Sequence, residues 1–228
     1  MWIESVGVAI VGGFLCLDRV FPQVLISRPI VAGPVIGVLL NDPYTGLITG
    51  AFVELLWIDR IPIGIYIPPN DSVVAILITA GSILAGSGLE HLSQSLFVLA
   101  FLLFLPFGSI GKKIEFLIIK SNDSLCRKAV EYAKAGNIKG ISRCHMAGLC
   151  KFFFMNVFLI LVPLSVGSAV LIWIYPILPR EIIKALYYTY FILPIVGITV
   201  ALNTIKLRGT IPVFSGFFLV FTLILKFF

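Results

Sequence analysis

The sequence predicts an all-α integral membrane protein, a multi-pass helical bundle whose N-terminal third contains short re-entrant or broken helices. Hydrophobic residues make up 59% and charged residues 12% of its 228 residues, whereas a soluble domain has about 25% charged residues. The mean hydropathy is +1.08. We expect residues 1–228 to form a single membrane domain, with N-terminal segments (1–111), a basic cytoplasmic arm (112–151) and C-terminal membrane helices (152–228).

The first apolar run, residues 5–17, has no Lys or Arg before it. A secretory signal peptide begins with a basic region, so we predict that this run is a retained membrane segment. The adjacent opposite charges Asp18-Arg19 follow it, and Asp59-Arg60 forms a similar pair later in the chain. We interpret both pairs as anchors at the membrane edge.

Between Arg28 and Asp71 the chain is apolar but is repeatedly interrupted by charges, prolines and glycines. Its uncharged runs hold 13, 11 and 10 residues (29–41, 43–53 and 61–70), whereas a membrane-spanning helix needs about 20. Irregular backbone and carboxylates at membrane depth are tolerated inside protein or beside a water-filled cavity. This part of the sequence therefore predicts a polar pathway for a substrate.

Glu54 is the first candidate binding residue in this region. It stands in the apolar segment GAFVELLW, where a carboxylate must be neutralised, paired or directed at a polar cavity. We favour a role in substrate binding. The alternative is a structural ion pair with Arg28 or Arg60.

Asn70 and Asp71 are the next candidates, in the segment IPPNDSVVA. One of the two is placed to cap a helix that begins near Ser72, and an amide with a carboxylate can also bind sugar hydroxyls. Asp42 is placed either to cap the segment that follows it or to contact a ligand. Arg28 enters the first short run and can serve as an interfacial anchor.

Gly46 and Gly50, four residues apart, allow close packing of two helices around the turn at Asp42. Farther along, residues 72–89 and 92–111 are long enough to cross or nearly cross the membrane, and we expect Pro106 to kink or end the second run. Three more uncharged runs follow the arm, at 152–179, 185–205 and 209–225.

The arm itself carries nine Lys and Arg residues against Glu115, Asp123 and Glu131. By the positive-inside rule we place it in the cytoplasm, and we expect Gly136-Asn137 to interrupt its helix. It lacks aromatic residues interleaved for base stacking, so we exclude nucleic acid as a partner. We assign the arm either a docking role or no binding role at all.

Several kinds of chemistry are excluded by the motifs. The four cysteines show no CxxC spacing, and the adjacent Cys144 and His145 point in directions about 100° apart on a helix, so we expect no disulfide and no metal site. Phosphate-binding glycine loops and nucleophile elbows are missing from the sequence. We therefore expect no cofactor and no self-contained hydrolase or ATPase.

Four sequence blocks in order resemble one known family, the membrane IIC subunit of the mannose/fructose/sorbose class of the bacterial sugar phosphotransferase system. The blocks are SRPIVAGPVIGVLLND (27–42), TGLITGAFVELLWI (45–58), PIGIYIPPND (62–71) and AGNIKGISRCH (135–145). Within them Arg28, Asp42, Glu54 and His145 match residues that the family commonly shows. The chain departs from it at Asn41-Asp42, where many members have Gly-Asp, and at Pro69-Asn70-Asp71, where some have Pro-Asp.

The resemblance implies a permease subunit in an oligomeric complex in the bacterial cytoplasmic (inner) membrane. Such a subunit assembles with a membrane IID subunit, and soluble IIA and IIB subunits pass a phosphoryl group from phosphoenolpyruvate to the sugar. The chain itself would be non-catalytic and carry no phosphorylated residue.

We therefore expect a hexose or amino sugar to bind near the bilayer midplane, lined by Glu54, Asn70 and Asp71, with Asp42 and Arg28 shaping the turns around it. The arm would dock IID or IIB. Two alternatives remain open at this point, an ion-coupled secondary transporter and a IIC-like scaffold in a regulatory phosphorelay without transport.

Overall fold

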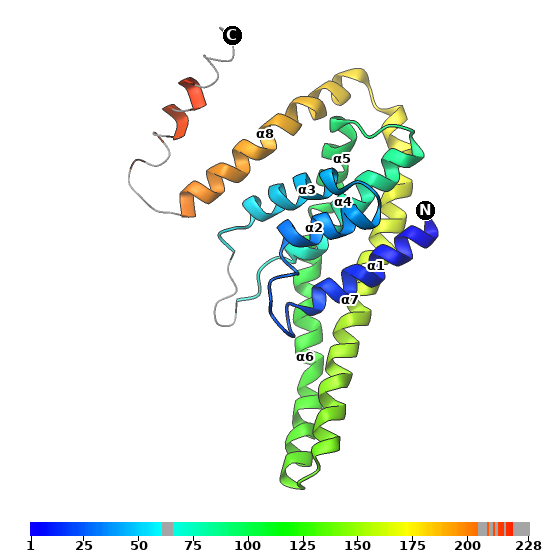
Figure 1. Cartoon of the computed structure of the whole chain (residues 1–228), viewed down its shortest axis with the longest axis vertical. Helices are drawn as coiled ribbons and strands as arrows, with labels where there is room; N and C mark the ends of the chain where they lie inside the picture. The colour runs from blue at the N-terminus through cyan, green and yellow to red at the C-terminus, as the bar shows by residue number, and fades with distance from the viewer. Residues whose placement is uncertain (61–65, 205–208, 210–211, 213, 217, 221–228) are drawn as a thin grey trace.

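The computed structural model describes residues 1–60, 66–204, 209, 212, 214–216 and 218–220, and within these residues it is helical, with no strand (Figure 1). The predicted helical membrane fold is thereby confirmed. Four helical segments, 71–88, 94–134, 138–177 and 180–204, are long and apolar enough to cross a membrane. The elements are α1 (Trp2–Leu17), α2 (Pro29–Leu39), α3 (Pro43–Leu56), α4 (Asp71–Gly88), α5 (Gln94–Phe104), α6 (Phe107–Lys134), α7 (Ile138–Ile174), the 3₁₀ turn η1 (Tyr175–Ile177) and α8 (Arg180–Thr204).

Helices α2 and α3 are the short helices that the sequence predicts for the N-terminal third. They have 11 and 14 residues, too few to span a bilayer alone. Each starts on a proline, Pro29 or Pro43, which suits the first helical position because no hydrogen bond of its N–H is lost there. A turn of three residues joins them, and its Asn41 has a left-handed backbone with φ of 61°.

Glycines let the backbones of α2 and α3 touch. A Cβ atom on Gly33 would collide with the carbonyl oxygen of Gly46, and one on Gly50 would collide with that of Pro29. A Cβ on Gly37 would lie 2.6 Å from the carbonyl oxygen of Asp42. The close packing predicted from Gly46 and Gly50 is confirmed, and Gly33 and Gly37 complete it from the facing helix. The two helices therefore form a tight hairpin.

Helix α4 lies at the centre of the bundle and packs against α1, α2, α3, α5, α6 and α7. Ile76, Leu77 and Ile78 are consecutive and all fully buried, so protein surrounds this helix on every side. Lipid tails are as apolar as these side chains, so close packing and not exclusion from water holds such a helix in place. The start of α4 is consequently a fixed point of the fold.

The run 92–111 is two helices and not one. Helix α5 ends at Phe104, and α6 begins at Phe107 after a two-residue turn that contains Pro106. The prediction that Pro106 kinks or ends the run is confirmed, since the run divides into α5 and α6 at this proline. A proline removes a backbone donor and clashes with the preceding turn, which accounts for the break.

Helices α6 and α7 pack side by side and extend together beyond the other helices as a long arm (Figure 1). Its tip is the predicted interruption, where Gly136 has a φ of +66° and Asn137 caps α7 by accepting a hydrogen bond from Gly140 N–H. Both helices run on past the expected limits of the arm: α6 starts inside the bundle, and α7 continues without a break into the membrane run after 152.

Helix α8 packs against α3 and α5, on the side of the bundle opposite α1 (Figure 1). The contact with α3 is close, because a Cβ on Gly197 would lie 2.8 Å from Leu55 Cβ. The last predicted membrane run, 209–225, lies in large part outside the described residues.

Candidate functional site

A polar cavity of about 560 Å³ lies where the α1–α2 and α3–α4 connections meet α4 and α6. Three parts of the chain that are distant in sequence (18–28, 60–72 and Glu115) contribute to it, so the cavity is a product of the tertiary fold. Its lining consists of Asp18, Arg19, Gln23, Leu25, Ser27, Arg28, Arg60, Tyr66, Ile67, Pro68, Asp71, Ser72 and Glu115.

Arg19 joins these three parts. Its Nη1 donates to Asp71 Oδ1 at 2.7 Å, and its Nη2 donates to Glu115 Oε2 at 3.5 Å. All three side chains are largely buried, with exposed fractions of 14%, 19% and 10% in the order Arg19, Asp71, Glu115. One guanidinium therefore links the start of α4 to the base of the arm. With two carboxylates and one guanidinium, the cluster has a formal excess of one negative charge.

Asp18 organises the connection between α1 and α2. Its carboxylate accepts hydrogen bonds from the backbone N–H groups of Val24 (2.7 Å) and Ser27 (3.1 Å) and from the Ser27 hydroxyl (3.0 Å). Burial raises the pKa of Asp18, but the hydrogen bonds from Ser27 and Val24 outweigh burial and hold the pKa below its ordinary value. The connection is thus folded around an ionised carboxylate.

We interpreted Asp18-Arg19 as an anchor at the membrane edge, and the structure shows that both side chains are engaged inside the protein. Asp18 is only 2% exposed, and Arg19 lies in the buried ion-pair cluster. The second pair, Asp59 and Arg60, does lie at an exposed position, with 3.3 Å between Arg60 Nε and Asp59 Oδ1.

Glu54 forms an ion pair with Arg28 across the α2–α3 hairpin. Its second oxygen accepts a longer hydrogen bond, 3.4 Å, from the backbone N–H of Ile30. The sequence left open whether Glu54 pairs with Arg28 or Arg60, and the structure selects Arg28. Arg28 is 40% exposed and lines the cavity, whereas Glu54 is 15% exposed and does not line it.

Asn70 and Asp71 have different surroundings although they are neighbours. Asn70 is 1% exposed and caps α4, its Oδ1 accepting from Val73 N–H at 3.1 Å. Its backbone N–H donates to the carbonyl oxygen of Gly108 at 2.9 Å, which attaches α6 to the start of α4. Asp71 instead directs its carboxylate to Arg19 and the cavity.

Asp42 caps α3. Its carboxylate accepts from the backbone N–H of Thr45 at 3.0 Å and from the Thr45 hydroxyl at 2.6 Å. Capping was one of the two roles that the sequence allowed for this residue. Asp42 does not line the polar cavity.

Of the five predicted binding residues, the fold brings Arg28 and Asp71 to the cavity and leaves Glu54, Asn70 and Asp42 outside its lining. Sequence reasoning missed Arg19, Asp18 and Glu115. The available signal was the placement of two charges directly after an apolar run. Within the ranges that the structure describes, no group of three or more His, Cys, Asp or Glu residues is placed to hold a metal ion.

Comparison with known sequences supports one family. The profile described as "PTS system sorbose-specific iic component" matches residues 2–228. The fructose permease IIC component of Bacillus subtilis (strain 168) is 28% identical over 195 residues, which cover 84% of this chain and 69% of that protein. The mannose-specific EIIC component of Escherichia coli (strain K12) is 22% identical over 217 residues, covering 93% and 77%.

A shorter match joins the chain to the putative N-acetylgalactosamine permease IIC component 2 of Escherichia coli (strain K12), 32% identical over 84 residues, or 37% of this chain and 63% of that protein.

Two solved structures share the fold. One, titled "Structure of membrane protein", superposes with a TM-score of 0.74 at 21% identity. The other, described as a mannose transporter ManYZ in complex with microcin E492, superposes with a TM-score of 0.61 at 19% identity. Each match covers 97% of this chain and 87% of the matched chain.

Proposed function

The chain belongs to the family of sorbose-type IIC components of the phosphotransferase system and is a IIC sugar permease of the mannose/sorbose family, and we propose that the polar cavity is its sugar-binding site. The observation that carries the proposal is the convergence of Gln23 and Arg28, from the α1–α2 connection, with Asp71, from the start of α4, on one cavity. Its volume of about 560 Å³ lies within the range of about 300–1,000 Å³ usual for small-molecule sites.

The lining suits a polyhydroxylated ligand. A sugar hydroxyl both donates and accepts hydrogen bonds, and the cavity offers the acceptor Asp71, the donor Arg28 and the amide Gln23, which does both. The sugar is a hexose or amino sugar. Because Asp71 and Arg28 are already engaged with Arg19 and Glu54, their positions are set before a ligand arrives, which lowers the entropy lost on binding.

The five predicted residues then divide by role. Asp71 and Arg28 contact the sugar, and Glu54 orients Arg28 through their ion pair. Asn70 fixes the start of α4 beneath Asp71, and Asp42 fixes the turn of the hairpin. In this proposal only two of the five touch the ligand directly.

The proposed complex contains a membrane IID subunit and soluble IIA and IIB phosphocarriers, in the inner membrane of a bacterium. The arm faces the cytoplasm, in keeping with its excess of basic residues, and docks IID or IIB. Glu115 supports this arrangement because it lines the cavity and belongs to α6, the first helix of the arm. The sugar cavity therefore lies at the base of the surface where the phosphoryl donor would arrive.

The test is phosphoenolpyruvate-dependent uptake of a panel of radiolabelled hexoses and amino sugars. Membranes contain this chain and its candidate IID, and purified IIA, IIB and the general phosphocarriers are added. We expect phosphorylated sugar to accumulate only when phosphoenolpyruvate is present. Asp71→Asn and Arg28→Gln should each reduce uptake about tenfold or more, since a hydrogen bond to a charged group contributes about 1.5–3 kcal/mol.

Glu181→Gln is the matched control for Asp71→Asn and Arg180→Gln is the matched control for Arg28→Gln, because both residues are exposed on α8, outside the cavity lining and the arm. The binding-site assignment is wrong if Asp71→Asn and Arg28→Gln transport like wild type in a complex that still assembles. If Glu54→Gln and Asn70→Ala also leave uptake and phosphorylation untouched, a role in transport is rejected for all four of these residues.

A further inference from the structure

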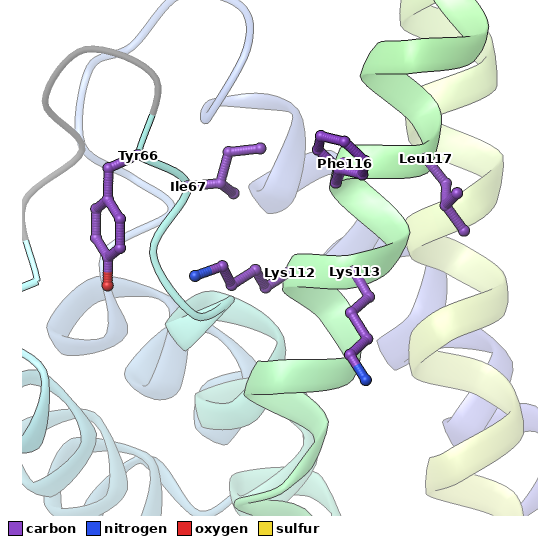
Figure 2. Close-up of a pocket in the computed structure, with 6 residues that line it drawn as sticks. All are labelled: Tyr66, Ile67, Lys112, Lys113, Phe116 and Leu117. Atoms are coloured by element: carbon purple, nitrogen blue, oxygen red, sulfur yellow. The ribbon is translucent and has the colours of Figure 1, made fainter.

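A second hollow, of about 510 Å³, lies next to the polar cavity, between α6 and the segment that leads into α4 (Figure 2). We call it the lysine groove. Its lining is Tyr66, Ile67, Lys112, Lys113, Phe116 and Leu117. Two of these residues, Tyr66 and Ile67, also line the polar cavity. The two hollows therefore share a wall, and a group bound in the lysine groove lies beside the polar cavity.

The free positive charge of this region lies in the groove and not in the cavity. The arginines that line the polar cavity are each paired with an acidic side chain, and they are Arg19, Arg28 and Arg60. Among the residues that the structure describes, neither Lys112 nor Lys113 takes part in an ion pair. An anion that arrives next to the polar cavity would therefore bind at these two lysines.

Lys112 is directed at the shared wall. In Figure 2 it extends from α6 toward the segment of Tyr66 and Ile67, and its Nζ lies 4.7 Å from the centre of the Tyr66 ring. An aromatic ring attracts a cation but carries no charge that would neutralise it. Lys113, the next residue, is exposed. The groove thus offers two positive charges, one of them directly beside the cavity wall.

The apolar part of the groove lies farther along the arm. Helix α6 runs from the bundle at Phe107 toward the tip of the arm, so Phe116 and Leu117 stand about one turn farther from the bundle than the lysines. They are 56% and 60% exposed. A protein that binds along the arm would cover these apolar side chains and direct an anionic group toward the bundle. A membrane lipid would need the opposite order, with the charged residues farthest from the bundle.

We propose that the lysine groove is the docking site of the phosphorylated IIB subunit, with its phosphoryl group at Lys112 and Lys113 and an apolar surface against Phe116 and Leu117. This inference rests on the proposed function, in which the arm faces the cytoplasm and IIB brings the phosphoryl group, and it names IIB as the partner at the base of the arm. A phosphoryl group carries a charge of about −1.5 to −2 near pH 7, which complements two lysines. Docking here brings that group to the wall of the sugar cavity.

The test measures the affinity of purified IIB for the complex of the full-length chain with IID in lipid nanodiscs, without sugar. IIB is used unphosphorylated, and phosphorylated by phosphoenolpyruvate, the general phosphocarriers and IIA. We expect the phosphorylated form to bind about tenfold or more tightly, the factor that one hydrogen bond to a charged group contributes. The groove variant, Lys112→Gln combined with Lys113→Gln, should remove this difference between the two forms.

Two control variants make the same change in net charge elsewhere. The first is Arg180→Gln combined with Lys184→Gln, on exposed residues of α8 outside the arm. The second is Lys128→Gln combined with Lys134→Gln, on exposed residues of α6 nearer the tip of the arm. Both should retain the preference for phosphorylated IIB. Equal affinity of the two forms for the wild type overturns the proposal, and so does an equal loss of the preference in the groove variant and the second control, because the overall charge of the arm would then explain it.

Cross-linking identifies the occupant of the groove. A photoreactive benzoylphenylalanine in place of Leu117 should form adducts with IIB when IIB is present at a saturating concentration. Adducts with IID or with lipid under the same conditions would show that another molecule covers this surface and would overturn the proposal.

Sugar binding separates a failure of this proposal from a failure of the proposed function. Equilibrium binding of the radiolabelled sugar is measured on the same complex without IIB, where the groove variant should bind sugar like wild type and Asp71→Asn should not. Normal docking of IIB to the groove variant, with sugar binding lost in Asp71→Asn, would overturn the docking site alone. Normal sugar binding by Asp71→Asn, with the preference for phosphorylated IIB lost in the groove variant, would support the docking site and reject the sugar site.

Discussion

Arg19 Nη1 lies 2.7 Å from Asp71 Oδ1, although the two residues are 52 positions apart in the chain. The same guanidinium reaches Glu115, 96 positions away. This one side chain therefore links the end of α1, the start of α4 and the base of the arm. It sets the geometry of the polar cavity that all three residues line.

Replacing Arg19 should destabilise the protein more than any single carboxylate replacement in the cluster. Arg19→Ala leaves Asp71 and Glu115 facing each other without a cation, and losing one partner of a buried ion pair costs about 3–5 kcal/mol. Arg19→Lys retains the positive charge but lacks the planar guanidinium that binds two carboxylates at once. Its loss of stability should therefore be smaller than that of Arg19→Ala. Thermal unfolding of the detergent-solubilised protein measures both.

Arg60→Ala is the control for this experiment, since Arg60 also lines the cavity but its side chain is 53% exposed and its acidic partner is adjacent in sequence. We expect almost no change in its unfolding temperature. Equal effects of Arg19→Ala and Arg60→Ala would contradict the bridging role of Arg19.

The glycine contact between α2 and α3 predicts a sharp difference between two Gly→Ala substitutions. Gly33→Ala should destabilise the hairpin by about 1–3 kcal/mol or more, because the new methyl group meets the rigid backbone of Gly46. Gly7→Ala in α1 has open space around the new methyl group and should be neutral or slightly stabilising, as alanine favours the helix. Unfolding in a denaturant series compares the two; similar losses would refute the close contact.

Asn70 offers a way to separate helix capping from sugar contact. Asn70→Ser keeps an oxygen that can cap α4 without adding a charge beside Asp71, whereas Asn70→Ala removes the oxygen and should cost about 1 kcal/mol of stability. If Asn70 acts by capping alone, Asn70→Ser should transport nearly as well as wild type. Stability and sugar uptake are measured on the same preparations, and an uptake defect in Asn70→Ser with stability unchanged would show a direct role in binding.

Asp18 predicts a dependence of stability on pH. Its pKa is lowered in the folded protein, so its contribution is fully present above its unfolded pKa of about 3.9 and is lost as the pH falls through the lower, folded value. Asp18→Asn should therefore be less stable than wild type near pH 7, and the two should converge in strong acid. Unfolding temperatures recorded from pH 7 downward test this; a constant difference at every pH would be inconsistent with an ionised Asp18.

Local sequence patterns were sufficient to predict the short helices and several helix ends. Pro29 and Pro43 begin short helices, Pro106 ends a run, and Gly136 forms the tip of the arm. Each of these effects depends on backbone geometry within a few residues, so the sequence alone contains the information. The same holds for Asp42 and Asn70, which cap helices through a donor three residues ahead.

The ion pairs could be predicted from the sequence only in part. Glu54 had two possible partners, Arg28 and Arg60, and the choice depended on α2 and α3 folding back on each other through four glycines. The spacing of four that indicates close packing occurs at Gly46 and Gly50 and also at Gly33 and Gly37. The pattern shows that each helix has a surface for close packing, but only the tertiary structure shows that the two surfaces face each other.

The sequence by itself determined that this is a helical membrane protein with a broken, polar N-terminal third, because composition, run length and proline placement act locally. Only the tertiary structure decided that Arg19 is the central residue of the cavity. Its own neighbourhood, a pair of opposite charges after an apolar run, is equally typical of a membrane edge. The cost of burying its charge is compensated by carboxylates 52 and 96 residues away in the sequence. Those carboxylates come within reach only after α4 and α6 have packed.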